Sequence, residues 1–194
     1  MTSNKETLRQ LIEDNCLDAS HDYVLSTGEN SAFYFDCKKA TLDGYALSLI
    51  SDFMLEEINS LPTTPVAIGG LTLGADFIVA GVVMRAAQTD HPTKFGSIVR
   101  KEPKKHGTKN KVENQLPKGT SIVVVDDVIT SGRSTLIACD ELEKEGYNIV
   151  GVVALVDRQQ GGADKIRERY PNVRALFYAS DFHKLDEIKK SATG

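Results

Sequence analysis

Residues 120–135 read TSIVVVDDVITSGRST: four β-branched apolar residues lead into two acids and then into a stretch rich in hydroxyl side chains. A continuous apolar run without polar alternation is typical of a central parallel strand that is covered on both faces. Leu136, Ile137 and Leu142 then recur at helical spacing, and Gly146 ends that pattern. We therefore expect a buried strand, an acidic tip at its end, and a helix over residues 133–145.

Two ligand-binding features lie close together in this segment. Backbone N–H groups at a helix start, together with the four hydroxyl side chains of residues 130–135 (the phosphate turn), favour a dianionic phosphate. The carboxylates of Asp126 and Asp127 repel phosphate at contact, so they suit neutral hydrogen-bond donors such as the vicinal hydroxyls of a ribose. A ligand that has both parts is a sugar phosphate.

The segment resembles the phosphoribosyl diphosphate (PRPP) binding loop of the type I phosphoribosyltransferases: hydrophobic strand, two acids, two aliphatic residues, then Thr-Ser-Gly. The resemblance implies the α/β fold of that family, a mostly parallel twisted central sheet with helices on both faces. It also implies PRPP contacts for the whole loop, which comprises Asp126, Asp127, Val128, Ile129, Thr130, Ser131, Gly132, Arg133 and Ser134.

Other nucleotide and signalling motifs do not fit the chain. The loops G-x-x-x-x-G-K-[ST] and G-x-G-x-x-G are absent, which removes the usual ATP and NAD sites. The acidic pair of a receiver domain also follows a Val-rich strand, but that strand is the first of its domain, whereas Asp126 lies well past the middle of this chain.

Length and composition favour one domain with a substantial core, residues 1–194. The chain has 194 residues, 41% of them hydrophobic, and a net charge of −4, which disfavours a nucleic-acid binder with a globally basic face. Its three cysteines share no metal-ligand spacing, so we expect reduced thiols. No apolar signal region or membrane-spanning run occurs, and we expect a cytoplasmic protein.

Near the N-terminus, residues 23–25 and 33–35 are predicted to be two short strands around a polar loop. Leu25-Ser26-Thr27-Gly28, followed by Ser31 and Phe33-Tyr34-Phe35-Asp36, resembles the segment that forms a hood over the base in orotate phosphoribosyltransferases. The resemblance assigns the hood to about residues 1–40 and implies that Tyr34 and Phe35 enclose the pyrimidine. Some bacterial members carry a functional lysine in place of Ser26, so no cationic role is transferred to this residue.

The next part of the chain is predicted to be scaffold around a glycine-rich turn. Apolar spacing predicts a helix over residues 43–61, a buried strand over 65–70, and a second helix that runs toward Gln88. The turn Gly-Gly-Leu-Thr-Leu-Gly-Ala-Asp between them resembles the pyrophosphate-contacting turn of the phosphoribosyltransferases. Other orotate enzymes have Tyr-Lys in place of Thr72-Leu73, so contacts here are expected from backbone N–H groups and the Thr72 hydroxyl.

A basic loop follows a predicted strand over residues 95–99. Six Lys and Arg side chains lie within residues 100–111, without helical or strand periodicity, in a connection that extends to Pro117. A solvated charge run is one interpretation, and nucleic-acid binding is disfavoured because no aromatic residues are interleaved. The pattern Arg-Lys-Glu-x-Lys-x-His-Gly resembles the catalytic loop of orotate phosphoribosyltransferases, which closes the neighbouring subunit's site. The resemblance implies PRPP and pyrophosphate contacts from Arg100, Lys101, Lys104 and His106.

The C-terminal third is predicted to complete a right-handed βαβ unit with a strand over 149–156. Asp157-Arg158-Gln159-Gln160-Gly161-Gly162 follows, which places Arg158 on the same rim as Asp126. A guanidinium offers a bidentate match to a carboxylate. A salt bridge to Asp157 or to another local acid is the alternative, but Asp-Arg-x-x-Gly-Gly resembles the orotate-binding turn of the family. A helix over 163–170, a strand over 173–178 and a helix over 181–190 end the chain.

The four motifs together predict an orotate phosphoribosyltransferase of pyrimidine biosynthesis that acts as a homodimer on PRPP and orotate. The resemblance implies catalytic roles for Lys104, His106, Lys101, Arg100 and Asp127, and orotate contacts from Tyr34, Phe35, Thr130 and Arg158. It also implies Mg²⁺ held mainly through PRPP oxygens, with no dedicated protein ligands. A phosphoribosyltransferase for a purine or uracil and a non-catalytic PRPP-sensing regulator remain as alternatives.

Overall fold

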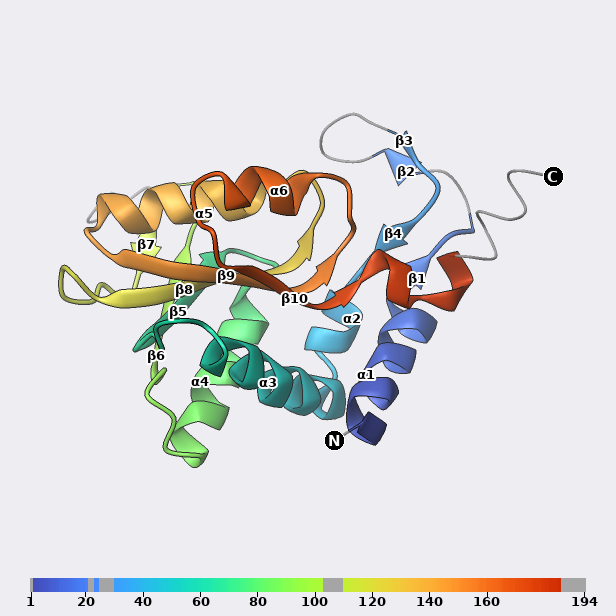
Figure 1. The fold of residues 1–194 in the computed structure, drawn as a ribbon, viewed down its shortest axis with the longest axis horizontal. Helices are drawn as coiled ribbons and strands as arrows, with labels where there is room; N and C mark the ends of the chain where they lie inside the picture. The colour runs from blue at the N-terminus through green and yellow to red at the C-terminus, as the bar shows by residue number, and fades with distance from the viewer. Residues whose placement is uncertain (1, 21–22, 25–29, 103–109, 186–194) are drawn as a thin grey trace.

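A central sheet with helices on both faces organises the computed structural model, which describes residues 2–20, 23–24, 30–102 and 110–185 (Figure 1). Neighbouring strands run parallel except β6 and β7, which are antiparallel. In spatial order the strands are β10 (Val173–Tyr178), β9 (Asn148–Asp157), β8 (Ser121–Ile129), β5 (Ala67–Leu71), β6 (Phe95–Val99) and β7 (Val112–Glu113). This mostly parallel arrangement confirms the predicted fold class.

The helices divide between the two faces of the sheet. On one face lie α1 (Thr2–Asn15), α2 (Lys38–Thr41), α3 (Gly44–Asn59) and α4 (Asp76–Gln88), and on the other lie α5 (Arg133–Lys144) and α6 (Gly162–Arg167) (Figure 1). The Asp43 side chain accepts a hydrogen bond from the Ala46 N–H at 2.8 Å, which caps the long scaffold helix α3 where it was predicted to begin.

Strand β8 has no polar alternation because each of its faces meets a different part of the core. Val123 and Val125 pack with α1, α3 and α4, whereas Ile122 and Val124 pack with α5 and α6. All four side chains are at most 1% exposed. Burying a branched apolar side chain stabilises a fold by about 1.5–3 kcal/mol, so this strand anchors both layers.

The prediction that the two acids form a tip at the end of the strand is wrong, because β8 continues through both acids to Ile129. Its parallel pairing with β9 includes Asp126 opposite Ala154 and Ile129 opposite Asp157. β9 is long enough to supply backbone partners beyond the acids, and Val128 and Ile129 continue the apolar pattern. The carboxylates therefore project from a hydrogen-bonded ladder rather than from a loop.

The two strands predicted around the polar loop do not pair with each other. β2 (Tyr23–Val24) pairs with β3 (Asn30–Ser31), whereas β4 (Tyr34–Phe35) pairs with β1 (Leu17–Asp18). The chain turns between β3 and β4, where the Ser31 hydroxyl donates to the Phe33 carbonyl at 2.8 Å, so β4 adds to β1 instead of to β2. Ser26 lies outside the described residues.

The remaining elements agree with the predictions except in the connection after β6 and at the C-terminal end of the chain. β7 forms within the segment predicted to be an irregular connection, because Val112 and Glu113 fold back against β6. The turn η1 (Ala179–Asp181) precedes a short helical stretch over 183–185, and the rest of the predicted terminal helix lies outside the described residues. None of the helices in the described ranges has the length and apolar character needed to cross a membrane.

Candidate active site

A cavity of about 620 Å³ opens at the carboxyl end of β8. Most of the predicted site residues line it: Tyr34, Phe35, Lys101, Asp126, Asp127, Val128, Thr130, Ser131, Gly132, Arg133, Ser134 and Arg158. These residues come from β4, from the end of β6, from β8 and the turn after it, and from the end of β9. The fold therefore brings together segments from all parts of the chain, as expected for the rim of a parallel sheet.

The phosphate turn is shaped by a glycine at the start of α5. Gly132 is the N-cap residue, has φ of +77°, and places no side-chain cap on the first turn of the helix. A Cβ at this position would lie 2.7 Å from the carbonyl oxygen of Gly162, so the turn packs directly on the start of α6. Uncapped N–H groups at a helix N-terminus suit an anion such as phosphate.

The two acids of β8 have different environments. Asp126 is 6% exposed and accepts a hydrogen bond from the Thr135 hydroxyl at 2.7 Å. Burial, with the neighbouring Asp127 carboxylate, raises the pKa of Asp126 to about 8. The carboxylate of Asp127 is half-buried, accepts from the Val128 N–H at 2.9 Å, and packs against Gly74. The Thr135 hydroxyl is therefore committed to Asp126 and is not the phosphate ligand that the sequence suggested.

Arg158 is a buried cation without an acidic partner among the described residues. Only 3% of it is exposed, and burial lowers the pKa of its guanidinium. Its Nη2 donates to the Ser31 hydroxyl at 2.7 Å and to the Phe33 carbonyl at 3.0 Å. Its Nε is buried and has no hydrogen-bond partner among the described residues. The alternative of a salt bridge to a local acid is wrong among the described residues, because the Nη2 partners of Arg158 are Ser31 and Phe33 and the Asp157 carboxylate accepts from the Gln159 N–H.

Comparison with known proteins identifies the family. The phosphoribosyl transferase domain model matches residues 42–174. Orotate phosphoribosyltransferase from Synechocystis sp. is 39% identical over 165 residues, which cover 84% of this chain and 81% of that protein. This chain belongs to the orotate phosphoribosyltransferase family.

Solved structures agree with the family assignment. A phosphoribosyltransferase from Corynebacterium diphtheriae superimposes with a TM-score of 0.78 and 30% identity, covering 92% of this chain and 98% of that one. Orotate phosphoribosyltransferase from Mycobacterium tuberculosis, solved in complex with PRPP, gives a TM-score of 0.72 and 28% identity with the same coverage. The predicted phosphoribosyltransferase fold is thereby confirmed.

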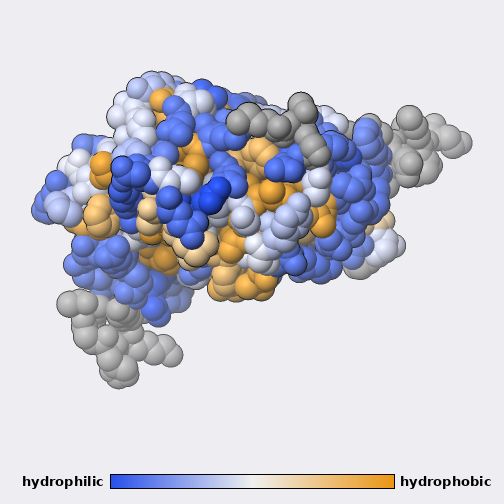
Figure 2. All heavy atoms as spheres, turned by 90° about the horizontal axis from the view of Figure 1, so that it is seen from below, coloured by the Kyte–Doolittle hydropathy of each residue, from blue (hydrophilic) through white to orange (hydrophobic). Residues whose placement is uncertain are grey.

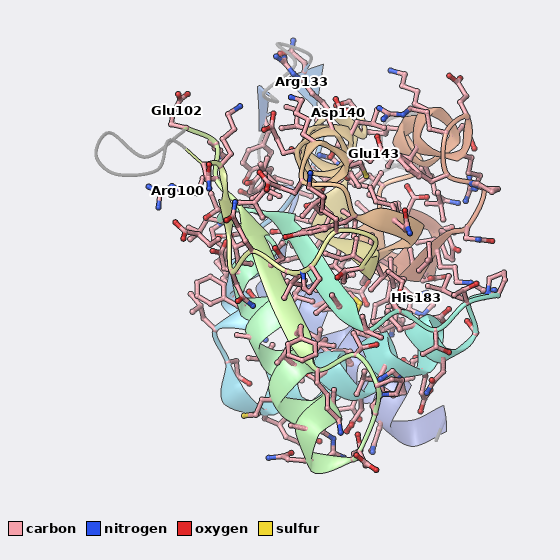
Figure 3. The ribbon with its side chains drawn as sticks, turned by 90° about the vertical axis from the view of Figure 1, so that its left-hand side faces the viewer. Arg100, Glu102, Arg133, Asp140, Glu143 and His183 are labelled. Atoms are coloured by element: carbon pink, nitrogen blue, oxygen red, sulfur yellow. The ribbon has the colours of Figure 1, made fainter. Side chains whose placement is uncertain are left out.

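The basic loop of the family is described only at its two ends. Lys101 lines the cavity, whereas Arg100 is exposed, pairs with Glu113 at 3.2 Å and lies outside the lining. Arg100 and Glu102 nevertheless lie at the same end of the molecule as Arg133 at the start of α5 (Figure 3). Lys104 and His106 lie outside the described residues, so their predicted roles stay predictions.

Two predicted PRPP ligands are already engaged elsewhere. The Thr72 hydroxyl donates to Asp76 at 3.2 Å and the Thr72 N–H donates to the Val99 carbonyl at 2.8 Å, so neither group faces the cavity freely. Ile129 is 1% exposed in the core between β8 and α5, and its carbonyl accepts from the Arg158 N–H at 3.0 Å. Its side chain is scaffold, because an aliphatic group at this point fills the core.

Several contributors were missed from the sequence. Leu71 and Ile137 line the cavity. Ser31 and Phe33 hold the Arg158 guanidinium although they belong to the N-terminal segment. The only local signal was that Ser31 and Phe33 fall within the hood motif, and nothing in that motif indicates a contact with the C-terminal third of the chain.

Proposed function

We propose that this protein transfers the 5-phosphoribosyl group from PRPP to orotate, giving orotidine 5′-phosphate and pyrophosphate in pyrimidine nucleotide synthesis. The observation that carries the choice of base is Arg158, a buried guanidinium that has no acidic partner among the described residues and borders the same cavity as the phosphate turn. A buried, unpaired charge is costly, and a carboxylate-bearing base removes that cost. Orotate is the pyrimidine that carries a carboxylate.

The proposed substrate contacts follow the chemistry of the cavity. The phosphate turn holds the 5′-phosphate through N–H groups and the hydroxyls of Thr130, Ser131 and Ser134. Asp126 and Asp127 accept hydrogen bonds from the ribose hydroxyls. The ring of Tyr34, 39% exposed at the cavity wall, covers the pyrimidine, as an aromatic face suits a flat base.

The chemical step needs positioning and charge neutralisation more than covalent help. Pyrophosphate departs from C1 of the ribose and leaves oxocarbenium character, and the orotate nitrogen attacks from the opposite face. Cations of the basic loop, Lys101 among them, neutralise the departing pyrophosphate, while the fixed turn and the acids keep the reacting atoms in line. We assign the same role to Arg100, Lys104 and His106 on the strength of the loop motif.

We propose that Mg²⁺ binds together with PRPP. Within the described ranges, no group of three or more His, Cys, Asp and Glu side chains lies close enough to hold a metal ion. The Asp127 carboxylate would suit a hard cation, but a Mg²⁺ ion prefers six oxygen ligands and would take most of them from PRPP and water. When bound, the ion offsets the charge of the pyrophosphate group.

We further propose a homodimer in which the basic loop of one subunit closes the site of the other. Support comes from large apolar side chains that remain more than half exposed, namely Leu42, Tyr45, Leu73, Met84 and Phe95. Figure 2, which views the molecule from the side of α3 and α4, shows apolar surface between hydrophilic areas.

Residues 1–194 act as one domain in this proposal, and three reduced cysteines favour the cytoplasm.

Complementation between two impaired variants, assayed at low orotate, tests the trans arrangement. Lys104→Ala and Arg158→Ala damage different parts of the site, and subunit exchange between them creates heterodimers. If the loop acts across the interface, one of the two sites in each heterodimer has both residues intact, and mixing restores activity. If subunit exchange is verified by mass and the mixture is no more active than the separate variants, the trans loop is contradicted.

The decisive measurement is Mg²⁺-dependent release of pyrophosphate from PRPP with orotate, compared with uracil, hypoxanthine and adenine. Release with orotate alone is the expected result. Release with another base contradicts the role of Arg158 and leaves the PRPP site standing. PRPP binding without release for any base supports a sensor instead of an enzyme.

A further inference from the structure

The guanidinium of Arg158 joins two parts of the chain that are far apart in sequence. Arg158 follows the last residue of β9, and its Nη2 bonds to the Ser31 hydroxyl at 2.7 Å and the Phe33 carbonyl at 3.0 Å. The Phe33 ring lies over it, with 4.3 Å from the ring centroid to Cζ. One charged side chain thus connects the end of the sheet to the N-terminal strands.

The Ser31 hydroxyl is oriented to accept from the guanidinium. Its single proton is donated to the Phe33 carbonyl at 2.8 Å, so its lone pairs remain for the hydrogen bond from Nη2. Ser31 is 7% exposed and Arg158 3%, which keeps water from competing for either group. The hydrogen bond from Nη2 to Ser31 therefore fixes the direction of the guanidinium, because water does not compete for either group.

Strand pairing holds Ser31 in place. Ser31 lies opposite Tyr23 in the β2–β3 ladder, and the Tyr23 ring stacks on Tyr34 with centroids 5.4 Å apart. Tyr34 lines the cavity. The same small set of strands thus positions both the aromatic wall of the base site and the acceptor for Arg158.

We propose that Ser31 is a positioning residue that orients the Arg158 guanidinium and so sets the preference for a base that carries a carboxylate. This inference rests on the proposed function. Both Nη2 protons are committed to Ser31 and Phe33, so the plane of the guanidinium is fixed and its other donors meet the carboxylate in one direction. Charge-assisted hydrogen bonds weaken steeply when misaligned. Loss of the Ser31 oxygen frees the guanidinium to tilt, which weakens orotate binding and leaves the phosphate turn untouched.

Steady-state kinetics of Ser31→Ala test the proposal. Loss of a hydrogen bond to a charged group predicts a rise of roughly ten- to hundredfold in the orotate KM. The PRPP KM and kcat at saturating orotate stay unchanged, and the preference for orotate over uracil falls. Ser51→Ala is the matched control, because Ser51 is also buried and donates to a backbone carbonyl, that of Leu47 within α3.

Two further comparisons separate positioning from a structural role. Ser31→Thr and Ser31→Val have the same shape and differ by the hydroxyl, so Thr retains a low orotate KM and Val does not. In an Arg158→Ala background, Ser31→Ala causes no further loss of kcat/KM for orotate, because it acts through the missing side chain.

Distinct outcomes overturn the inference and the function. An unchanged orotate KM in Ser31→Ala, an equal rise in the PRPP KM, equal values for Thr and Val, or an additive loss in the double variant each contradict the role of Ser31. Wild-type protein that releases no pyrophosphate with orotate contradicts the proposed function itself.

Discussion

At the scale of single residues, neighbouring side chains of one type differ because their surroundings differ. Asp126 and Asp127 are adjacent on β8, yet one is buried against Thr135 and the other packs on Gly74. Both acids line the cavity, but Asp126 lies next to a helix residue and Asp127 next to a glycine of the turn after β5, so their neighbours differ. The sequence presents them as an equivalent pair, and the packing distinguishes them.

Replacing Asp126 with Asn is expected to stabilise the protein at neutral pH while lowering activity. The pKa of Asp126 is raised to about 8, so the folded state binds a proton more tightly than the unfolded chain. Stability therefore falls as the pH rises from about 4, the unfolded pKa, toward 8. Asp126→Asn removes that loss, on the order of 1 kcal/mol or more at pH 7. Urea unfolding between pH 5 and 8 measures it, and a variant less stable at pH 7 than wild type contradicts the argument.

Gly74→Ala is expected to weaken PRPP binding with little loss of stability. A Cβ at Gly74 would lie 2.4 Å from Oδ1 of Asp127, so that carboxylate must rotate. Rotation of the half-buried Asp127 side chain costs little folding free energy. Because the rotated carboxylate no longer reaches the ribose hydroxyls, we expect the PRPP KM to rise about tenfold or more. Gly44→Ala, where no atom lies within 4 Å, is the control. Unchanged kinetics in Gly74→Ala would show that the position of Asp127 is not set by this glycine.

At the scale of elements, the turns after β8 and β9 form one unit. The Arg158 N–H donates to the Ile129 carbonyl, and Gly162 packs against the backbone of the phosphate turn. The phosphate site and the base site are therefore joined through backbone contacts between two adjacent strand ends. Neither turn alone indicates this contact, because it depends on the parallel pairing of β8 with β9.

Gly162→Ala is expected to disturb the phosphate turn. The added Cβ would lie 2.3 Å from the Thr130 carbonyl oxygen and 2.7 Å from the Gly132 nitrogen, and backbone atoms cannot move aside as cheaply as a flexible side chain. We expect a higher PRPP KM together with a loss of roughly 1–3 kcal/mol in the free energy of unfolding. Kinetics and urea unfolding measure both effects, and a variant with wild-type values of both refutes the close packing.

At the scale of the whole molecule, the N-terminal helix is attached to the C-terminal segment. Within α1, the Arg9 guanidinium pairs with the buried Glu13 carboxylate and also donates to the Asp181 carbonyl at 3.3 Å. The other oxygen of Glu13 accepts from the Lys184 N–H at 2.7 Å. Phe182, fully buried between these contacts, completes the attachment.

Glu13→Gln is expected to lower stability without changing the kinetics. Removing the buried carboxylate leaves Arg9 paired with the exposed Glu6 alone, and loss of a hydrogen bond to a charged group typically costs about 1.5–3 kcal/mol. The pair lies away from the cavity, so the KM values for orotate and PRPP should stay at their wild-type values wherever the variant is folded. Thermal unfolding and kinetics at a low temperature separate the two effects. Glu6→Gln removes the exposed partner of Arg9 and serves as the control, with a much smaller expected loss.

The sequence by itself determined the elements and motifs whose information is local. The apolar run of β8, the helical spacing of α3 and α5, and the Thr-Ser-Gly turn each lie within a few consecutive residues, so their structure and the family could be predicted. The tertiary structure decided what depends on distant partners. These features are the pairing of the N-terminal strands, the separate environments of Asp126 and Asp127, and the burial of Arg158 against Ser31. Each arises from contacts across the sheet or between its layers, and local pattern carries no information about such contacts.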